Sequence, residues 1–318
     1  MERIIEKKGK RFLLRVETSE DPDDYPKYEE LRNDIWEWPV DSLPGARNML
    51  CGNFFHDGGS LFIGVFEESE SGGFDESTPI GFAYGFIGVI DKRVGFRSLD
   101  NLQFYSQYTG VKKGYERYGL GVPIKELQKD ALMEHFGIYT ITCTYDPLTG
   151  VNAYRNVHHF GMDIVRYNRD IYGKFGGRLN RADVPSDRLS ASWDLRRSIV
   201  RPDVNLHSLL DQGSLTTRVE FVEVAGHSGP LELGVLKEVD LDREKETLLL
   251  EIPFNWYQIL KETDVADEET RKIPSHWRMK TREAFLSLFD RGYRVIDFRP
   301  LDLDGRKRDF YVLDRRGR

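Results

Sequence analysis

The amino-acid sequence predicts an α/β protein of the α+β type, with a mixed, mostly antiparallel sheet flanked by helices and a C-terminal α/β extension. Three observations predict this fold class. Several β-rich runs follow one another in the first 111 residues, with a single helical pattern among them. A glycine-bearing loop then opens a long helical pattern that ends before Gly137. After residue 203 the order is strands, one strong helix and two closing strands.

The first 111 residues alternate β-rich runs with that one helical pattern. Leu31, Ile35 and Trp38 recur at helical spacing, and Pro39 ends the pattern. Polar turns separate the β-rich runs, and two strands around such a turn are typical of a hairpin. The elements expected here are a strand at Arg11–Val16, a helix at Tyr25–Trp38, a hairpin of strands Leu61–Phe66 and Ile80–Ile90, and a strand at Leu102–Val111.

Helical and β-type patterns also alternate in the rest of the chain. After the loop, Ile124, Leu127 and Ala131 recur at helical spacing. Pro202 and the polar residues beside it indicate a junction, so we expect two domains, 1–200 and 201–318. The elements expected after the first long helix are strands at Ile138–Thr144, Met162–Arg166, Val219–Val224, Leu231–Val239, Thr247–Ile252, Arg294–Phe298 and Asp309–Leu313, helices at Val151–Phe160 and His276–Asp290, and an irregular stretch at Tyr167–Ser190.

Composition excludes several classes of protein. The 318 residues include 46 Lys and Arg against 53 Asp and Glu, a net charge of −7, which argues against nucleic acid as the main partner. Two cysteines, Cys51 and Cys143, are too few for a disulfide scaffold or a multi-cysteine metal site. No apolar run approaches the ~20 residues of a membrane span, and the N-terminus has no apolar signal core. We expect a cytoplasmic protein that uses no metal and no membrane.

The loop from Lys113 to Gly121 is the most informative stretch for chemistry. Gly119 and Gly121 stand at the start of the helix, and Pro123 must lie in its first turn, since deeper it would remove an intrahelical hydrogen bond. Such a loop presents backbone N–H groups at the positive end of a helix dipole, an arrangement suited to a pyrophosphate. From this local pattern alone, a plain strand-to-helix turn is an equally good interpretation. The loop matches neither a Walker A motif nor the dinucleotide fingerprint.

The order of elements around this loop resembles that of the GNAT superfamily of N-acetyltransferases. Gly119 and Gly121 match the family's motif A, and the resemblance implies that the loop holds the pyrophosphate of acetyl-CoA. The family usually has Arg or Gln where this chain has Glu116, and Arg117 stands one place late. A carboxylate beside a pyrophosphate is unfavourable unless it turns away.

A longer succession of short motifs resembles a branch of predicted GNAT acetyltransferases whose substrate is unassigned. It covers about residues 80–195 and continues near the C-terminus. There, a strand ending at Ile252-Pro253 and a helix before Gly292 echo the first copy, so the last third is expected to be a degenerate second copy of the half-fold. It has no Gly-x-Gly, and we expect an acceptor-pocket or dimerisation role rather than a second CoA site. The motifs of the first copy are Thr144-Tyr145-Asp146-Pro147-Leu148, Asn152-Ala153, Asn156, Phe160-Gly161, Tyr172-Gly173, Asp187-Arg188 and Trp193.

The position of the usual catalytic acid is a departure from the family. Many members place a Tyr four residues before the glycine that ends the short helix, and here that residue is Val157. Acyl transfer needs a base for the amine proton and often an acid for the thiolate. Tyr154, His158 and His159 are nearby alternatives, although a surface histidine or one with satisfied hydrogen bonds is the favoured interpretation of His158 and His159. Neighbouring residues of a helix point about 100° apart, so at most one of the two histidines is expected to face a cleft.

Several other polar residues have both a structural and a functional interpretation. Asp146 is first of all part of an Asp-Pro turn, and a structural ion pair or cap is favoured for Asp187 and Arg188. Tyr172 is as well explained by packing as by an acceptor site. The three basic residues near the start of the last helix are interpreted as a solvated face rather than a binding patch. They are Arg278, Lys280 and Arg282.

These observations predict an N-acyltransferase that moves an acetyl or other acyl group from acyl-CoA to a small-molecule amine by direct attack, without a metal. A non-catalytic acyl-CoA-binding or sensing protein is the main alternative, and an assembly protein that keeps only the fold is a third. A homodimer is also considered. The candidate cofactor-binding residues are Thr109, Val111, Lys113, Gly114, Arg117, Gly119, Leu120, Gly121, Asn152 and Asn156, and the candidate catalytic residues are His158 and Tyr154.

Overall fold

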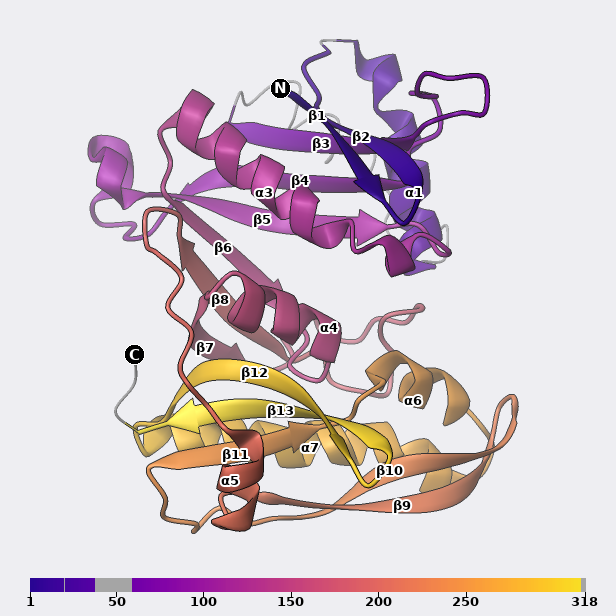
Figure 1. Ribbon diagram of the computed structural model, residues 1–318, viewed down its shortest axis with the longest axis vertical. Coiled ribbons are helices and arrows are strands. Elements are labelled where there is room, and N and C mark those ends of the chain that lie inside the picture. Colours follow the sequence, from indigo (N-terminus) through magenta and orange to yellow (C-terminus); the bar gives the residue numbers. More distant parts are fainter. Residues whose placement is uncertain (20, 38–58, 316–318) are drawn as a thin grey trace. The chain divides into compact units, whose positions relative to one another are not determined.

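The computed structural model describes residues 1–19, 21–37 and 59–315 (Figure 1). The predictions for Cys51 and for a helix end at Trp38 fall outside these residues. The strands are β1 (Glu2–Lys7), β2 (Lys10–Val16), β3 (Ser60–Glu67), β4 (Gly81–Val89), β5 (Leu102–Val111), β6 (Thr140–Tyr145), β7 (Asp163–Asn168), β8 (Arg188–Asp194), β9 (Thr217–Gly226), β10 (Gly229–Val239), β11 (Thr247–Ile252), β12 (Arg294–Leu303) and β13 (Arg306–Asp314).

Helices alternate with these strands, and two of them continue as π-helical turns. The α-helices are α1 (Pro26–Trp36), α3 (Gly121–Ala131), α4 (Gly150–Ala153), α5 (Leu206–Asp211), α6 (Trp256–Glu262) and α7 (Glu268–Asp290). The π-helical turns are η6 (Leu132–Phe136) after α3 and η7 (Tyr154–His159) after α4. The short 3₁₀ turns are η1 (Pro22–Asp24), η3 (Gly95–Arg97), η4 (Leu99–Asn101) and η5 (Glu116–Tyr118). None of the helices in the described ranges is both long enough and apolar enough to cross a membrane.

The strands form three sheets. The large sheet has eight strands in the order β1-β2-β3-β4-β5-β6-β8-β7, and its first five strands are antiparallel to their neighbours. β5 and β6 are parallel, and β7 and β8 are antiparallel. The order of the three-stranded sheet is β11-β13-β12, and β9 pairs with β10 alone in the third sheet. The predicted fold class, a mixed and mostly antiparallel sheet flanked by helices with a C-terminal α/β extension, is therefore confirmed.

The chain folds into two compact units. Unit 1 comprises Met1–Cys143 and Asp194–Arg197, and unit 2 comprises Thr144–Trp193 and Ser198–Arg318. The division falls within strands β6 and β8 of the large sheet. The domain boundary near residue 200 that the sequence suggests remains a prediction about independent folding.

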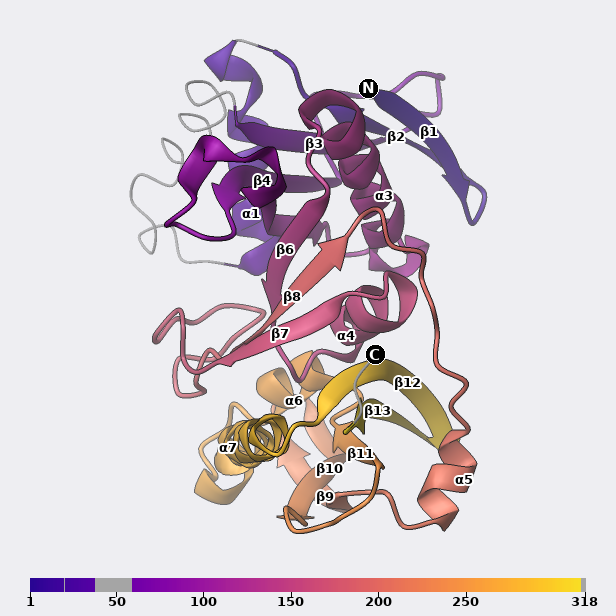
Figure 2. The same ribbon diagram turned by 90° about the vertical axis from the view of Figure 1, so that its left-hand side faces the viewer.

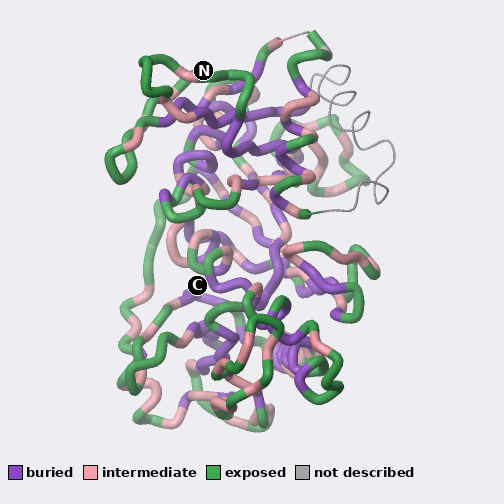
Figure 3. Tube along the Cα trace, turned by 90° about the vertical axis from the view of Figure 1, so that its right-hand side faces the viewer, coloured by how far each residue is buried: buried purple, intermediate pink, exposed green. Residues whose placement is uncertain are grey.

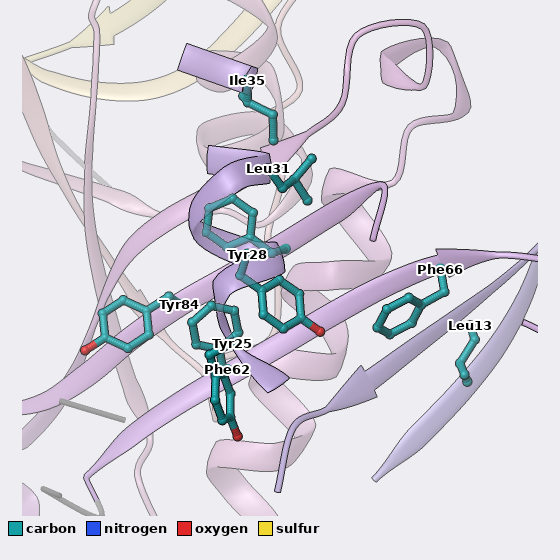
Figure 4. Close-up of a cluster of buried hydrophobic side chains, with 9 residues drawn as sticks. Leu13, Tyr25, Tyr28, Leu31, Ile35, Phe62, Phe66 and Tyr84 are labelled. Atoms are coloured by element: carbon teal, nitrogen blue, oxygen red, sulfur yellow. The ribbon is translucent and has the colours of Figure 1, made fainter. Parts of the chain in front are cut away.

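The core of unit 1 follows from the two-residue period of its strands. On β3, Phe62 and Phe66 point to one face, where Tyr28 and Leu31 of α1 pack against them (Figure 4). The alternate residues of β3 point to the opposite face, which helix α3 contacts. Figure 2 shows α1 and α3 on opposite sides of these strands. Because both faces are covered, the sequence of β3 is a nearly continuous apolar run and does not alternate between apolar and polar residues.

Strand β5 carries two local features that place the loop that follows it. A Cβ on Gly110 would lie 2.7 Å from the ring of Trp36, so glycine is required where α1 packs on this strand. The register between β4 and β5 shifts after Tyr84, and Gln107 is the extra residue of a β-bulge. The bulge increases the local twist of β5 just before the loop.

Unit 2 holds its three-stranded sheet between α5 and α7. Phe310 and Val312 of β13 point to the α5 side, where they pack with Leu206 and Leu249, and the intervening residues point to the other side. Figure 3 colours the chain trace by how far each residue is buried. Helix α7 starts at Glu268, eight residues before the predicted His276, and Pro274 lies inside it.

The last third repeats the topology of the preceding segment. Strand, helical segment, strand and strand follow one another in both, and in both the last strand lies between the first two: β6-β8-β7 and β11-β13-β12. Gly161 and Gly292, both with positive φ, stand two residues before β7 and β12. Each of those strands has a register shift around its third residue. This correspondence agrees with the second copy that the sequence predicts.

Two strands and two α-helices within the described residues were not predicted. β1 pairs with β2 through a turn at Lys8-Gly9, where both residues have positive φ. β8 occupies the end of the stretch expected to be irregular. The helices α5 and α6 have six and seven residues, which is too short for a helical period to be recognised.

Candidate functional site

The loop between β5 and α3 has the backbone that its glycines predict. Gly114 and Gly119 have φ values of +91° and +65°, and Gly119 ends the short turn η5 in the left-handed region. α3 then begins at Gly121, with Pro123 in its first turn as expected. The two glycines are needed because L-residues with side chains rarely adopt such φ values.

Two backbone N–H groups at the start of α3 have no hydrogen-bond acceptor among the described residues. They belong to Leu120 and Gly121, whereas Gly119 donates to the Glu116 carbonyl at 3.2 Å. They stand at the positive end of an 11-residue helix. Lys113 and Arg117 are exposed beside them, and the Arg117 guanidinium lies over the ring of Tyr118. The geometry suits an anion that needs several N–H donors.

The Glu116 side chain turns into the loop rather than away from it. Its Oε2 accepts a hydrogen bond from the N–H of Gly114 at 2.7 Å. A carboxylate therefore binds a loop amide from which an anionic ligand would also accept a hydrogen bond. The departure from the family pattern at this position has a structural consequence: the chain supplies its own anion to the loop.

Strand β5 leads into this loop, and its last residues extend beyond its pairing with β6. Thr109 and Val111 pair with Ala83 and Gly81 of β4 on one edge. On the other edge, the parallel register with β6 joins Phe104 to Ile141 and Tyr105 to Thr142, and among the described residues of unit 1 it goes no further. β5 continues to Val111 beyond that point.

The helical segment of α4 and η7 carries the other candidate residues, all in unit 2. Asn152 and Asn156 both accept hydrogen bonds from Arg155, at 2.9 and 3.3 Å, so their amide oxygens hold that guanidinium. Val157 is buried in the core. Tyr154 is 41% exposed, and its ring lies 4.7 Å from that of His158.

His158 is paired with a carboxylate that lies 139 positions away in the sequence. Its Nδ1 lies 2.8 Å from Oδ1 of Asp297 on β12. Asp297 is buried and also accepts from the N–H of Phe298 and from Nε of Arg299. Because a carboxylate only accepts, Nδ1 of His158 carries the proton in the neutral ring and Nε2 keeps its lone pair. His159 instead packs edge-on against Phe160.

A cluster of buried charges surrounds the turn between β6 and α4. Asp146 accepts from Nη2 of Arg278 at 2.5 Å and from the N–H of Leu148 at 2.9 Å. Arg188 approaches the same Oδ2 atom of Asp146 at 3.7 Å. The solvated helix face expected for Arg278 is wrong, because its side chain is fully buried. The nearby guanidinium groups hold the pKa of Asp146 below its usual value despite burial, which alone would raise it.

Asp187 extends this cluster on the other side. Its carboxylate accepts two hydrogen bonds from Arg282, at 2.7 and 2.5 Å, and one from the hydroxyl of Tyr167 at 2.6 Å. The ion pair expected for Asp187 is confirmed, although its partner is Arg282 rather than the neighbouring Arg188. Arg282 is therefore not a solvated residue either. Burial, with Asp187 beside the phenol, raises the pKa of Tyr167.

Two further carboxyl groups lie on neighbouring strands of unit 2. Glu251 is paired with Arg308, and burial raises its pKa nevertheless. Burial, together with the charge of Glu251, raises the pKa of Asp309 to about 7. A Cβ on Gly150 would lie 1.9 Å from Oδ2 of Asp309, so a larger residue where α4 begins would displace this carboxyl group.

The second copy contains a cavity of about 150 Å³. A parallel bridge joins Leu215, just before β9, to Leu249 of β11. The cavity lies where β9 and β11 continue beyond that bridge, and Phe221, Ile252 and Trp277 are among its lining residues. The sequence analysis identified no residue of this cavity as part of a site.

The structure thus groups the candidate residues into two sets. Those of the loop and β5, from Thr109 to Gly121, lie together in unit 1, and Asn152, Tyr154, Asn156 and His158 lie on one helical segment of unit 2. Asp297 was not predicted as a site residue, since no local pattern in the sequence links it to His158. No group of three or more His, Cys, Asp or Glu side chains that could hold a metal occurs in residues 1–19, 21–37 and 59–315.

No protein-family model and no curated protein matches the sequence. Among solved structures, the chain is similar to Arabidopsis thaliana NAA60 in complex with acetyl-CoA, with 14% identity, a TM-score of 0.42 and coverage of 58% of this chain and 99% of that one. It is also similar to the ribosomal-protein-S18-alanine N-acetyltransferase of Escherichia coli, with 14% identity, a TM-score of 0.40 and coverage of 61% of this chain and 99% of that one. A third similar structure is an acetyltransferase of the GNAT family from Streptococcus pneumoniae, with 14% identity, a TM-score of 0.39 and coverage of 57% of this chain and 97% of that one. The third is named as a member of the family that the sequence resembles.

Proposed function

We propose that this chain is an N-acyltransferase that transfers an acetyl or other acyl group from acyl-CoA to a small-molecule amine. The observation that carries the proposal is the start of α3, where the N–H groups of Leu120 and Gly121 have no acceptor among the described residues. A pyrophosphate supplies oxygens for such donors at a helix N-terminus. The resemblance of the loop to motif A of the GNAT family supports the same ligand.

The rest of the site fits an extended thioester ligand. β5 leads into the loop along the edge that parts from β6, and the backbone of Thr109 to Val111 would hold the pantetheine arm. Main-chain N–H groups in this position would also polarise the thioester carbonyl. Asn152 and Asn156 remain candidate contacts for the same ligand.

The proposed reaction is a direct transfer. The amine nitrogen attacks the thioester carbonyl carbon, a C–N bond forms, the C–S bond breaks, and the thiolate leaves as the CoA thiol after taking up a proton. The attacking nitrogen loses one proton. This reaction produces an amide and free CoA without a covalent protein intermediate.

We propose His158 as the base that takes the amine proton. Its Nδ1–H donates to Asp297, which fixes the ring in the tautomer with a free lone pair on Nε2 and stabilises the imidazolium that forms. Tyr154, whose ring lies 4.7 Å from that of His158, is the candidate acid for the thiolate, since Val157 cannot supply a proton.

An acyl-CoA-binding or sensing protein is the second candidate, and two observations favour it. Glu116 already binds a loop amide, and Val157 stands where many relatives have their acid. Under either candidate function the chain would bind acyl-CoA. Only the enzyme would release the free CoA thiol when an acceptor amine is present. Homodimerisation and a cytoplasmic location remain predictions.

Calorimetric titration with acetyl-CoA and CoA tests the shared binding step. We expect micromolar affinity that is lost in Gly119→Trp, because the side chain would fill the loop at a left-handed position. If a folded sample binds neither CoA nor longer acyl-CoAs, the transferase and the sensor are both wrong.

An amine screen that follows thiol release separates the two candidates. For an enzyme we expect His158→Ala to lower turnover by about 100-fold, the usual range for a general base, with acetyl-CoA affinity unchanged. His159→Ala is the matched control, since it removes the neighbouring ring. Equal loss in both variants would contradict the role of His158.

A further inference from the structure

We propose that Arg278, Arg188 and Trp256 form a buried binding site in unit 2 for a small ligand that carries one carboxylate. The two arginines approach Asp146 at the turn between β6 and α4, and Trp256 lies against Arg278. The site goes beyond the proposed acyl-CoA loop and does not depend on it, since every residue that defines it belongs to unit 2.

Hydrogen-bond donors without acceptors are the first evidence for this site. Arg278 is fully buried and uses only Nη2, towards Asp146, while its Nε and Nη1 donate to nothing within the described residues. The indole Nε1 of Trp256, which is 2% exposed, has no acceptor there either. The Arg278 guanidinium lies 5.1 Å from the centre of the Trp256 ring. Buried donors are nearly always satisfied in native proteins, so these three N–H groups call for an acceptor.

The balance of charge indicates that the acceptor is an anion. The cluster contains three guanidinium groups, of Arg188, Arg278 and Arg282, but two carboxylates, of Asp146 and Asp187, and none of the five side chains is more than 17% exposed. One positive charge is therefore left over among buried groups, and buried charges are normally paired. Asp170, at the exposed edge of the cluster, bonds to Ser186 and lies near both Arg282 and Lys174, so this exposed pair adds no net charge.

The size of the excess charge distinguishes a carboxylate from a phosphate. A single carboxylate neutralises one guanidinium and offers two oxygens with about four lone pairs to the waiting donors. A phosphate dianion would leave the buried cluster with an excess of negative charge. The unused Nε and Nη2 of Arg188 extend the same donor set, since within the described residues this side chain donates only through Nη1, to the Asp187 carbonyl.

Arg188 lies at the more exposed side of the proposed site, where a ligand would enter. It is the more exposed of the two arginines beside Asp146, and the rings of Tyr172 and Phe175, from the β7–β8 loop, cover its guanidinium at 5.3 and 5.9 Å. Half of Tyr172 is exposed. A ligand with an apolar body would rest on these rings while its carboxylate reaches the arginines.

Calorimetric titration of the full chain with benzoate and isovalerate, without any CoA, tests the site. We expect measurable binding of both acids and no binding of benzamide or isovaleramide, which have the same shape without the charge. Inorganic phosphate is titrated in parallel, and stronger binding of phosphate than of both acids would overturn the carboxylate assignment. The experiment is independent of acyl transfer, so its failure leaves the proposed function untouched.

Variants locate the bound acid. Arg188→Gln is expected to weaken benzoate binding at least tenfold, while Arg166→Gln, which removes an exposed charge on β7, leaves it unchanged. If Arg278→Lys does not fold, Trp256→Phe removes only the indole donor and is expected to weaken binding several-fold. Equal affinity in all variants, or a crystal structure soaked in benzoate with water alone at Nε and Nη1 of Arg278, would overturn the proposal.

Discussion

The loop of unit 1 and the buried cluster of unit 2 present donors without acceptors in opposite settings. In the loop they are the main-chain N–H groups of Leu120 and Gly121 beside exposed glycines. In the cluster they are side-chain N–H groups of Arg278 and Trp256, removed from solvent. Gly121 is partly exposed, so water can satisfy its N–H group at little cost, whereas an unfilled buried donor costs about 1–3 kcal/mol. Changes in the loop should therefore alter ligand affinity, and changes in the cluster should alter stability.

The largest change in stability is expected when one partner of the buried ion pair between Asp146 and Arg278 is removed. Arg278→Met leaves Asp146 buried without its main counter-charge, and we expect the free energy of unfolding to fall by about 3–5 kcal/mol. Urea denaturation followed by circular dichroism measures it. The double variant Asp146→Leu with Arg278→Met removes both charges and should recover part of the loss. A single variant as stable as the wild type would show that the cluster does not behave as a buried ion pair.

A buried carboxyl group should make the stability of unit 2 depend on pH. Burial raises the pKa of folded Asp309 to about 7, above its unfolded value of 3.8. Its proton therefore stabilises the fold fully below pH 4, and this contribution is lost as the pH rises through 7. Between pH 5 and 8 we expect the wild type to lose on the order of 2–3 kcal/mol relative to Asp309→Asn. The exposed Asp302→Asn is the control, and parallel pH curves for wild type and Asp309→Asn would refute the assignment.

A substitution in the backbone of the loop should lower the free energy of unfolding less than these changes in unit 2 do. Gly119 has a φ of +65° with open space around it, so Gly119→Ala meets backbone strain alone. We expect a loss of about 1 kcal/mol in the free energy of unfolding. Gly88→Ala, also in open space but without a positive φ, is the matched control. A loss several times larger would mean that the loop contributes to stability as the cluster does.

The smallest effect is expected at the carboxylate that binds the loop amide. Glu116→Gln removes an exposed negative charge next to the proposed pyrophosphate position, and repulsion between solvent-exposed charges is worth about 1 kcal/mol, or about fivefold in acetyl-CoA affinity. Stability should hardly change. Calorimetry compares it with Glu126→Gln, an exposed residue of α3. Weaker binding in Glu116→Gln than in that control would assign Glu116 an attractive role instead.

The sequence by itself determined the features that depend on neighbouring residues. β5 has the predicted bounds, α3 ends before Gly137, and the left-handed glycines of the loop stand where the turn requires them, because strand alternation, helical period and positive φ are local properties. The topology of the second copy could also be anticipated from Ile252-Pro253 and Gly292. The first eight residues of α7, which begins at Glu268, were not predicted.

Only the tertiary structure decided which polar residues are buried together. Asp146 and Arg278 are 132 positions apart, and His158 and Asp297 are 139 apart, so no spacing in the sequence links them. An arginine on a helix is usually solvated, and only the packing of α7 against its neighbours shows that Arg278 is not. Burial turns an ordinary charged residue into one whose every donor needs a partner, and burial is a property of the folded chain as a whole.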